Sequence, residues 1–176
     1  MEIVLRLLQP GDKAALTALC RDMDRTCLSG RLPEPYTEAD ADRWLSETAR
    51  KEGTEGLFRL ILVDGAPVGQ ITVERKDDIG CRDAEIGYML AAAYRSRGIM
   101  TYAAGLLCRE AFAAWDILRI SGRAHAENIA SRRVMEKNGF ILEGTLRRAF
   151  FKDGRVGDLC LYGPLREDYV KQYTVN

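Results

Sequence analysis

Residues 94–101 combine the residue types that bind phosphate. They read Tyr-Arg-Ser-Arg-Gly-Ile-Met-Thr and lie between a predicted strand and a predicted helix. The N–H groups in the first turn of a helix have no partner within that helix, and the helix dipole adds partial positive charge. Arg95 and Arg97 add two cations, and Gly98 lets the backbone approach a phosphate closely. The segment is a candidate phosphate-binding turn, although a polar surface loop without a ligand would contain the same residues.

The segments that flank this turn are predicted to be a strand and a helix. The strand covers residues 84–90, with Ala84, Ile86, Tyr88 and Leu90 on one face and Glu85, Gly87 and Met89 on the other. The helix covers residues 98–115, and a short strand follows over residues 118–124. A strand–helix–strand unit crosses over with a right hand and pairs its two strands in parallel.

Two further pairs of strands are predicted to form antiparallel hairpins. They comprise residues 58–63 with 68–73, and residues 140–151 with 156–165. Asp64-Gly65 and Asp153-Gly154 occupy the turns. Asp-Gly is favoured there because both central residues of a type I′ turn need positive φ.

Helix ends complete the predicted architecture. Asp12 is expected to cap a first helix, and Thr37 with Asp40 fits a capping box for a second. A later helix over residues 128–138 is expected to end at Gly139. With an opening strand, the sequence predicts one α/β (α+β) domain over residues 1–176, in which a mixed sheet carries packed helices.

Composition narrows the classes of function. The 26 Lys and Arg residues balance 26 Asp and Glu residues, so global charge gives no reason to expect nucleic acid or anionic lipid as a partner. Five scattered cysteines and a single histidine indicate neither a disulfide framework nor a metal site. Since no apolar run is long enough to cross a membrane and no signal peptide is recognised, a cytoplasmic protein is expected.

Two motifs resemble those of a known family. Arg95-x-x-Gly98-x-Met100 resembles the Arg/Gln-x-x-Gly-x-Gly/Ala pyrophosphate loop of the GNAT acetyltransferases, and departs from it at Met100. Residues 127–147 resemble the Asn-x-x-Ser-x-x-Val-x-x-Lys-x-Gly-Phe-x-x-Glu-Gly signature of the RimJ/RimL-like branch, which includes ribosomal-protein N-terminal acetyltransferases. The resemblance covers nearly the whole chain.

The resemblance implies that acetyl-CoA is the cosubstrate. Its pantetheine arm would insert where a central parallel pair of strands splays apart, and Gly87 suits either a close ligand approach or packing against a bulky neighbour. The implied cofactor contacts are Tyr88, Met89, Leu90, Arg95, Ser96, Arg97, Gly98, Ile99, Met100, Thr101, Asn128 and Ser131.

The resemblance also implies roles in catalysis. Glu85 is the candidate base, and burial beside the cleft would raise its pKa, although a salt-bridged strand glutamate is the alternative. Backbone N–H of Tyr88 or Met89 is the implied oxyanion donor. Asn128 resembles an orienting asparagine but suits a helix N-cap equally, and Ser131 is the candidate thiolate stabiliser or acid.

Three residues near these candidates have open roles. Phe150 stands where some relatives have a glutamate, so a mechanism that needs that carboxylate is in doubt. Tyr162 is an alternative acid. His125 titrates near neutrality, yet a structural role is expected for it.

The expected reaction is transfer of acetyl to a primary amine, most similar to acetylation of a protein N-terminus. A small amine such as a polyamine, aminoglycoside or amino-acid-like metabolite is the alternative, as are a longer acyl group and a CoA-binding sensor without turnover. Residues 25–36 and the final hairpin are expected to select the acceptor. A monomer and a homodimer are equally compatible with the sequence.

Overall fold

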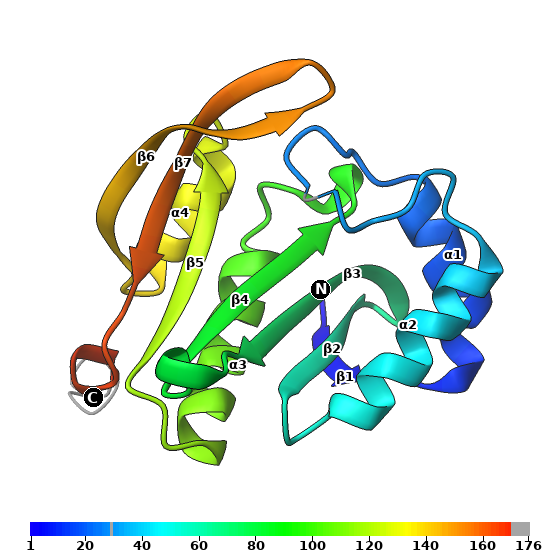
Figure 1. The fold of residues 1–176 in the computed structure, drawn as a ribbon. Coiled ribbons are helices and arrows are strands. Elements are labelled where there is room, and N and C mark those ends of the chain that lie inside the picture. Colours follow the sequence, from blue (N-terminus) through cyan, green and yellow to red (C-terminus); the bar gives the residue numbers. More distant parts are fainter. Residues whose placement is uncertain (29, 170–176) are drawn as a thin grey trace. The chain divides into compact units, whose positions relative to one another are not determined.

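The computed structural model describes residues 1–28 and 30–169 (Figure 1). Ser29, within the segment expected to select the acceptor, lies outside the described residues. In chain order the strands and α-helices are β1 (Ile3–Leu7), α1 (Lys13–Arg21), α2 (Glu38–Lys51), β2 (Gly56–Val63), β3 (Ala66–Arg75), β4 (Asp83–Leu90), α3 (Ile99–Ala114), β5 (Arg119–His125), α4 (Ile129–Lys137), β6 (Ile141–Lys152) and β7 (Arg155–Gly163). This is the element order that the sequence predicts.

The strands form a mixed sheet in the order β1-β2-β3-β4-β5-β7-β6. β4 pairs with β5 in parallel over three residue pairs, from Asp83 with Arg119 to Glu85 with Ser121. The pairs β1–β2, β5–β7 and β6–β7 are antiparallel. The predicted class, a mostly antiparallel sheet with one parallel pair and accompanying helices, is confirmed.

The chain divides into two compact units whose segments interleave. The first unit contains Met1–Thr72 and Gly87–Ala103, and the second contains Val73–Ile86 and the chain from Ala104 onward. Strands β3 and β4 and helix α3 contribute residues to both units. A single domain over the whole chain stays a prediction.

In the first unit, α1 and α2 lie side by side and share one apolar core (Figure 1). Leu16 and Cys20 from α1 meet Ala41 and Leu45 from α2 in a cluster that also contains Tyr36. Burial of these apolar side chains is the main free energy that holds the two helices together.

The start of α2 is the predicted capping box. Asp40 N–H donates to Thr37 Oγ1 at 3.3 Å, and Thr37 N–H donates to Asp40 Oδ2 at 2.9 Å. Two backbone donors at the helix start are thereby satisfied by side chains. Aspartate thus performs the role that glutamate or glutamine usually has in this motif.

The expectation that the Asp12 side chain caps α1 is wrong. Asp12 occupies the N-cap position, but its side chain makes no capping hydrogen bond to the helix. Its carboxylate instead accepts from both guanidinium Nη atoms of Arg6, at 2.6 and 2.7 Å, and from the Gln9 N–H. A two-pronged bond to a guanidinium is stronger than a neutral cap, so Arg6 outcompetes the helix for this carboxylate.

In the second unit, β6 and β7 form a long hairpin that pairs with β5 through β7 (Figure 1). Asp153 and Gly154 have φ values of 50° and 75° at its tip, as the predicted type I′ turn requires. The pairing register shifts between Leu146 and Phe150. Such a shift re-aims the side chains that follow it.

Among the described residues, no helix is long and apolar enough to cross a membrane. The five cysteines are free thiols, of which Cys20, Cys108 and Cys160 are buried. Burial raises the pKa of the Cys20 thiol to about 11 and that of the Cys108 thiol to about 12.

The capping box leads to a prediction about stability. Replacing Thr37 with alanine removes the side-chain acceptor for Asp40 N–H, and we expect the free energy of unfolding to fall by about 1 kcal/mol. Thr37→Ser keeps the hydroxyl and serves as the control, with a change of only a few tenths of a kcal/mol. Urea denaturation measures both variants. Equal midpoints for wild type and Thr37→Ala would show that the box adds nothing to stability.

Candidate functional site

The turn before α3 contains two residues in the left-handed region. Ser96 and Gly98 have positive φ, 59° and 77°. Residues 95–98 are exposed, whereas the side chains of Ile99 and Met100 are buried. The turn stays a candidate phosphate-binding segment with an exposed backbone and two exposed arginines, while the Met100 side chain belongs to the core.

Arg95 is held by the first unit's own groups. Its Nη1 donates to Asp24 Oδ2 at 2.8 Å, and its Nε donates to the Leu90 carbonyl at 3.4 Å. The hydrogen bond from Arg95 holds the pKa of the Asp24 carboxyl well below its usual range, with further lowering from Thr26. Arg97 is exposed, and its guanidinium lies 5.6 Å from the centre of the Tyr94 ring.

Hydrogen bonds near both ends of the β3–β4 pair fix the direction of the β4 backbone groups. Lys76 N–H donates to Asp83 O at 3.0 Å, and Ala91 N–H donates to Val68 O at 2.8 Å. Residues that bond to the partner strand alternate along an antiparallel ladder. The odd-numbered residues from Asp83 to Ala91 therefore face β3, and the backbone N–H of Tyr88 points to the opposite edge of β4.

The two candidate oxyanion donors consequently differ. Met89 turns its backbone toward β3, and its side chain packs against the core cluster of α1 and α2. Tyr88 is half-buried and turns its backbone to the edge where Leu90 also presents its carbonyl. The oxyanion donor stays a prediction for Tyr88 or Met89, and of the two only the Tyr88 N–H points away from β3.

Glu85 forms an ion pair in the second unit. Its Oε1 accepts from Arg123 Nε at 3.0 Å and from Arg123 Nη2 at 2.8 Å. The Glu85 side chain is one-third exposed and that of Arg123 is half exposed. Both contacts use one carboxylate oxygen, so Oε2 retains the capacity to accept from an amine or a water molecule.

Asn128 and Ser131 meet at the start of α4. Asn128 is the N-cap, and its Oδ1 accepts from Ser131 N–H at 3.1 Å. The helix-capping alternative for Asn128 is thus realised, while its amide Nδ2 can still donate to another group. Ser131 is half-buried in the first turn of the helix.

Tyr162 is fully buried within a side-chain network. Its hydroxyl accepts from Arg132 Nε and donates to Glu136 Oε1, each at 3.0 Å. Burial raises the pKa of Tyr162, partly offset by the bond from Arg132. These contacts account for Tyr162 as a structural residue that links β7 to α4.

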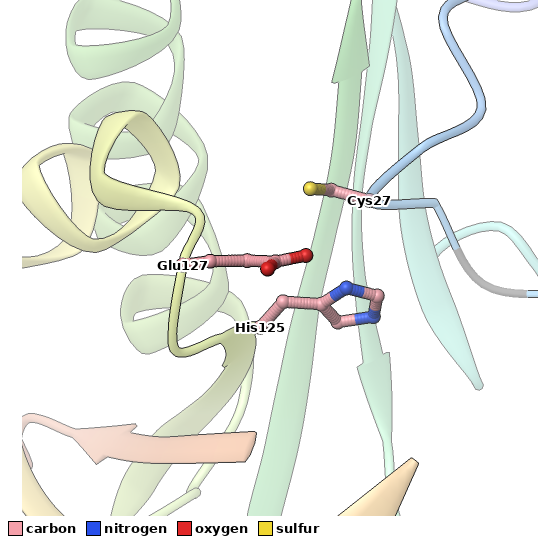
Figure 2. Close-up of side chains that lie close together, drawn as sticks. All are labelled: Cys27, His125 and Glu127. Carbon is pink, nitrogen blue, oxygen red and sulfur yellow. The ribbon is translucent and has the colours of Figure 1, made fainter. Parts of the chain in front are cut away.

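His125 ends β5 and stacks on Phe150. The ring centroids are 3.9 Å apart and the planes differ by 11°. Burial lowers the pKa of His125, Lys152 and Arg155 lower it further, and Glu127 opposes them. Figure 2 shows the side chains of His125 and Glu127 extending to the same side of the chain. Cys27, also labelled there, belongs to the first unit, whereas His125 and Glu127 belong to the second. We therefore do not assign these three residues as metal ligands.

Sequence reasoning missed two partners of the candidate residues. Ser121 pairs with Glu85 in the parallel ladder, and Arg123 lies two residues further on the same face of β5. A predicted register of these two strands would therefore have placed Arg123 beside the glutamate. Asp24 had no such signal, because 71 residues separate it from Arg95.

The stacked pair predicts an unusual titration of the single histidine. We expect NMR titration of His125 to give a pKa below its ordinary value of 6.5, because burial disfavours the imidazolium. The unfolded chain then takes up this proton first, so stability falls as pH drops from 6.5 through the folded-state pKa. Phe150→Ala should move the pKa back toward 6.5, whereas Phe151→Ala, which alters a ring that is 75% exposed, should not. An ordinary pKa in wild type would contradict the burial argument.

Comparisons with known proteins identify the family of the chain. A model of the acetyltransferase (GNAT) domain matches residues 2–141. "Putative ribosomal N-acetyltransferase YdaF" of Bacillus subtilis (strain 168) is 30% identical over 174 residues, which are 95% of this chain and 93% of YdaF.

Solved structures show the same fold. Mycobacterium smegmatis RimJ, in complex with CoA-disulfide, aligns with a TM-score of 0.79 and 26% identity over 94% of this chain and 82% of RimJ. RimL, a ribosomal L7/L12 alpha-N-protein acetyltransferase in complex with coenzyme A, aligns with a TM-score of 0.83 and 22% identity over 93% of each chain. The chain therefore belongs to the GNAT family, as an N-acetyltransferase similar to the RimJ/RimL-like branch.

Proposed function

We propose that this protein transfers acetyl from acetyl-CoA to the N-terminal α-amine of a protein or peptide. The observation that carries the proposal is the similarity to YdaF, whose name describes a ribosomal N-acetyltransferase and which aligns over almost its full length. The RimJ similarity supports the same branch. No feature of the described residues favours a small amine over a peptide, so that alternative is an outcome of the acceptor experiments.

The proposed contacts to the pyrophosphate and the pantetheine arm lie in the first unit. Arg95 to Met100 would bind the pyrophosphate through the left-handed backbone at Ser96 and Gly98 and through the exposed guanidinium of Arg97. The edge of β4 at Tyr88 and Leu90 would bond to the pantetheine amides, because their backbone groups face away from β3. Arg95 would leave Asp24 or bridge it to the ligand, since such exposed pairs contribute only about 0–1 kcal/mol.

The proposed chemistry is direct attack of the amine on the thioester carbonyl. A new C–N bond forms, the C–S bond breaks, and the amine loses a proton. Glu85 would accept that proton at Oε2, directly or through water. Tyr88 N–H would stabilise the negative oxygen, which is the largest single contribution in many acyl transfers. Ser131 would donate to the departing sulfur, and Asn128 would hold Ser131 and orient the substrate.

Acetyl-CoA binding tests the cofactor turn. Isothermal calorimetry should show binding by the wild type and a loss of at least about tenfold in Arg97→Ala, because phosphate bonds to a guanidinium are charge-assisted. Gly98→Val should also weaken binding, since a β-branched residue resists φ near 77°.

The matched control is Gly53→Val, which has the same φ class (78°) and the same open surroundings outside the turn. It should lose comparable stability but keep affinity for acetyl-CoA. If Gly53→Val and Gly98→Val weaken binding equally, the turn has no special role, and absence of binding by wild type would refute the proposed cosubstrate.

The base assignment is tested by two variants of one ion pair. Glu85→Gln should lower kcat by roughly 10²- to 10⁴-fold and abolish the acidic limb of the pH–rate profile. Arg123→Met removes the same ion pair while leaving the carboxylate in place. A purely structural Glu85 predicts equal, modest effects of both variants on rate and stability, and a normal pH profile in Glu85→Gln.

A further inference from the structure

The second unit has a pocket at the bulged part of the β6–β7 hairpin. It has a volume of about 280 Å³ and is lined by Ala126, Glu127, Phe150, Gly157 and Asp158. A space of this size holds one side chain or a short aliphatic amine rather than a whole cofactor. Glu127 and Asp158 are the two charged residues of this lining.

The aromatic wall is set in place by its neighbours. The register shift between Leu146 and Phe150 directs the Phe150 ring toward His125, on which it stacks. A Cβ at position 157 would lie 2.4 Å from two carbons of that ring, so only glycine lets the ring lie there. The ring is therefore a fixed surface, and an aromatic face attracts cations.

Both carboxylates have remaining capacity to accept. Asp158 Oδ1 accepts from Arg148 N–H at 2.7 Å, and its second oxygen can accept from a ligand. Glu127 bonds to Arg155 at 2.7 and 2.9 Å, but both side chains are about half exposed, and an exposed pair exchanges readily.

The candidate base lies on the same face as His125, the stacking partner of the pocket's Phe150, because Glu85 pairs with Ser121 and the residues 121, 123 and 125 share one face of β5. Arg123 and His125 point to the same face of β5, about 7 Å apart, and Arg123 holds Glu85. The Phe150 ring stacks on the His125 ring at that face. We propose that this pocket binds a cationic group of the acceptor, an alkylammonium or guanidinium near the reacting amine. This inference rests on the proposed function, and it specifies an acceptor that has a second, cationic group.

Matched acceptors test the inference. One pair of peptides begins with alanine and has lysine or norleucine as the second residue, and a second pair is 1,4-diaminobutane and butylamine. With saturating acetyl-CoA, we expect KM to be about tenfold lower for the cationic member, because a charged hydrogen bond is lost with the neutral one. A preference in the peptide pair alone identifies a basic peptide as the source of the cation, and one in the diamine pair alone identifies a small polyamine.

Two variants remove charge from the pocket without changing its shape. Glu127→Gln and Asp158→Asn should each reduce the KM ratio between neutral and cationic acceptors to near one. Asp153→Asn is the control: it makes the same charge change at the exposed tip of the same hairpin, outside the pocket, and should keep the wild-type ratio. Gly157→Ala should displace the Phe150 ring and also lower the ratio.

A second readout separates this inference from the proposed function. The NMR signals of His125, the single histidine, should shift on titration with the lysine peptide or diaminobutane but not with their neutral partners, and Asp158→Asn should abolish the shift. Failure of transfer to every amine, with this shift intact, would refute the proposed function and support the pocket. Equal KM values and no selective shift in wild type would overturn the pocket.

Discussion

The structure depends on how strand β4 shares its two edges. It pairs in parallel with β5 from Asp83 to Glu85, and its hydrogen bonds with β3 run from the Lys76–Asp83 bond to the Val68–Ala91 bond. Backbone groups of a strand need partners, and the even-numbered residues of β4 direct theirs away from β3. Arg95 donates to the Leu90 carbonyl, which joins the turn before α3 to the strand that precedes it.

Much of this arrangement could be predicted from the sequence because the signals are local. Asp64-Gly65 and Asp153-Gly154 fix two hairpins through backbone conformation alone, and the structure has positive φ at all four residues. Thr37 with Asp40 fixed the start of α2 in the same way. The right-handed crossover made the parallel pair a topological requirement rather than a matter of propensity.

Interactions between distant residues could not be predicted with the same success. Asp12 has the type and position of a helix cap, but Arg6 takes its carboxylate, and only the approach of β1 to that helix start decides the competition. Asp24 holds Arg95 across 71 residues. The Phe150–His125 stack depends on a register shift in β6, and no turn motif in the sequence predicts that shift. Charge-assisted and aromatic contacts of this kind depend on tertiary geometry, which a local pattern does not encode.

The face of β5 shows why packing and chemistry are coupled here. Ser121, Arg123 and His125 alternate with the buried Ile120 and Ala124, so the apolar face fixes the strand's register. A slip of one residue would bury the arginine and histidine and expose the core, at a cost of several kcal/mol. The polar face is therefore held rigidly by hydrophobic burial on the opposite side. Each residue on it has its own partner: Ser121 with Lys76, Arg123 with Glu85, and His125 with Phe150. The pleat of one strand thus sets the distances between these three polar side chains. An acceptor that contacts two of them must have its own polar groups at the matching distance.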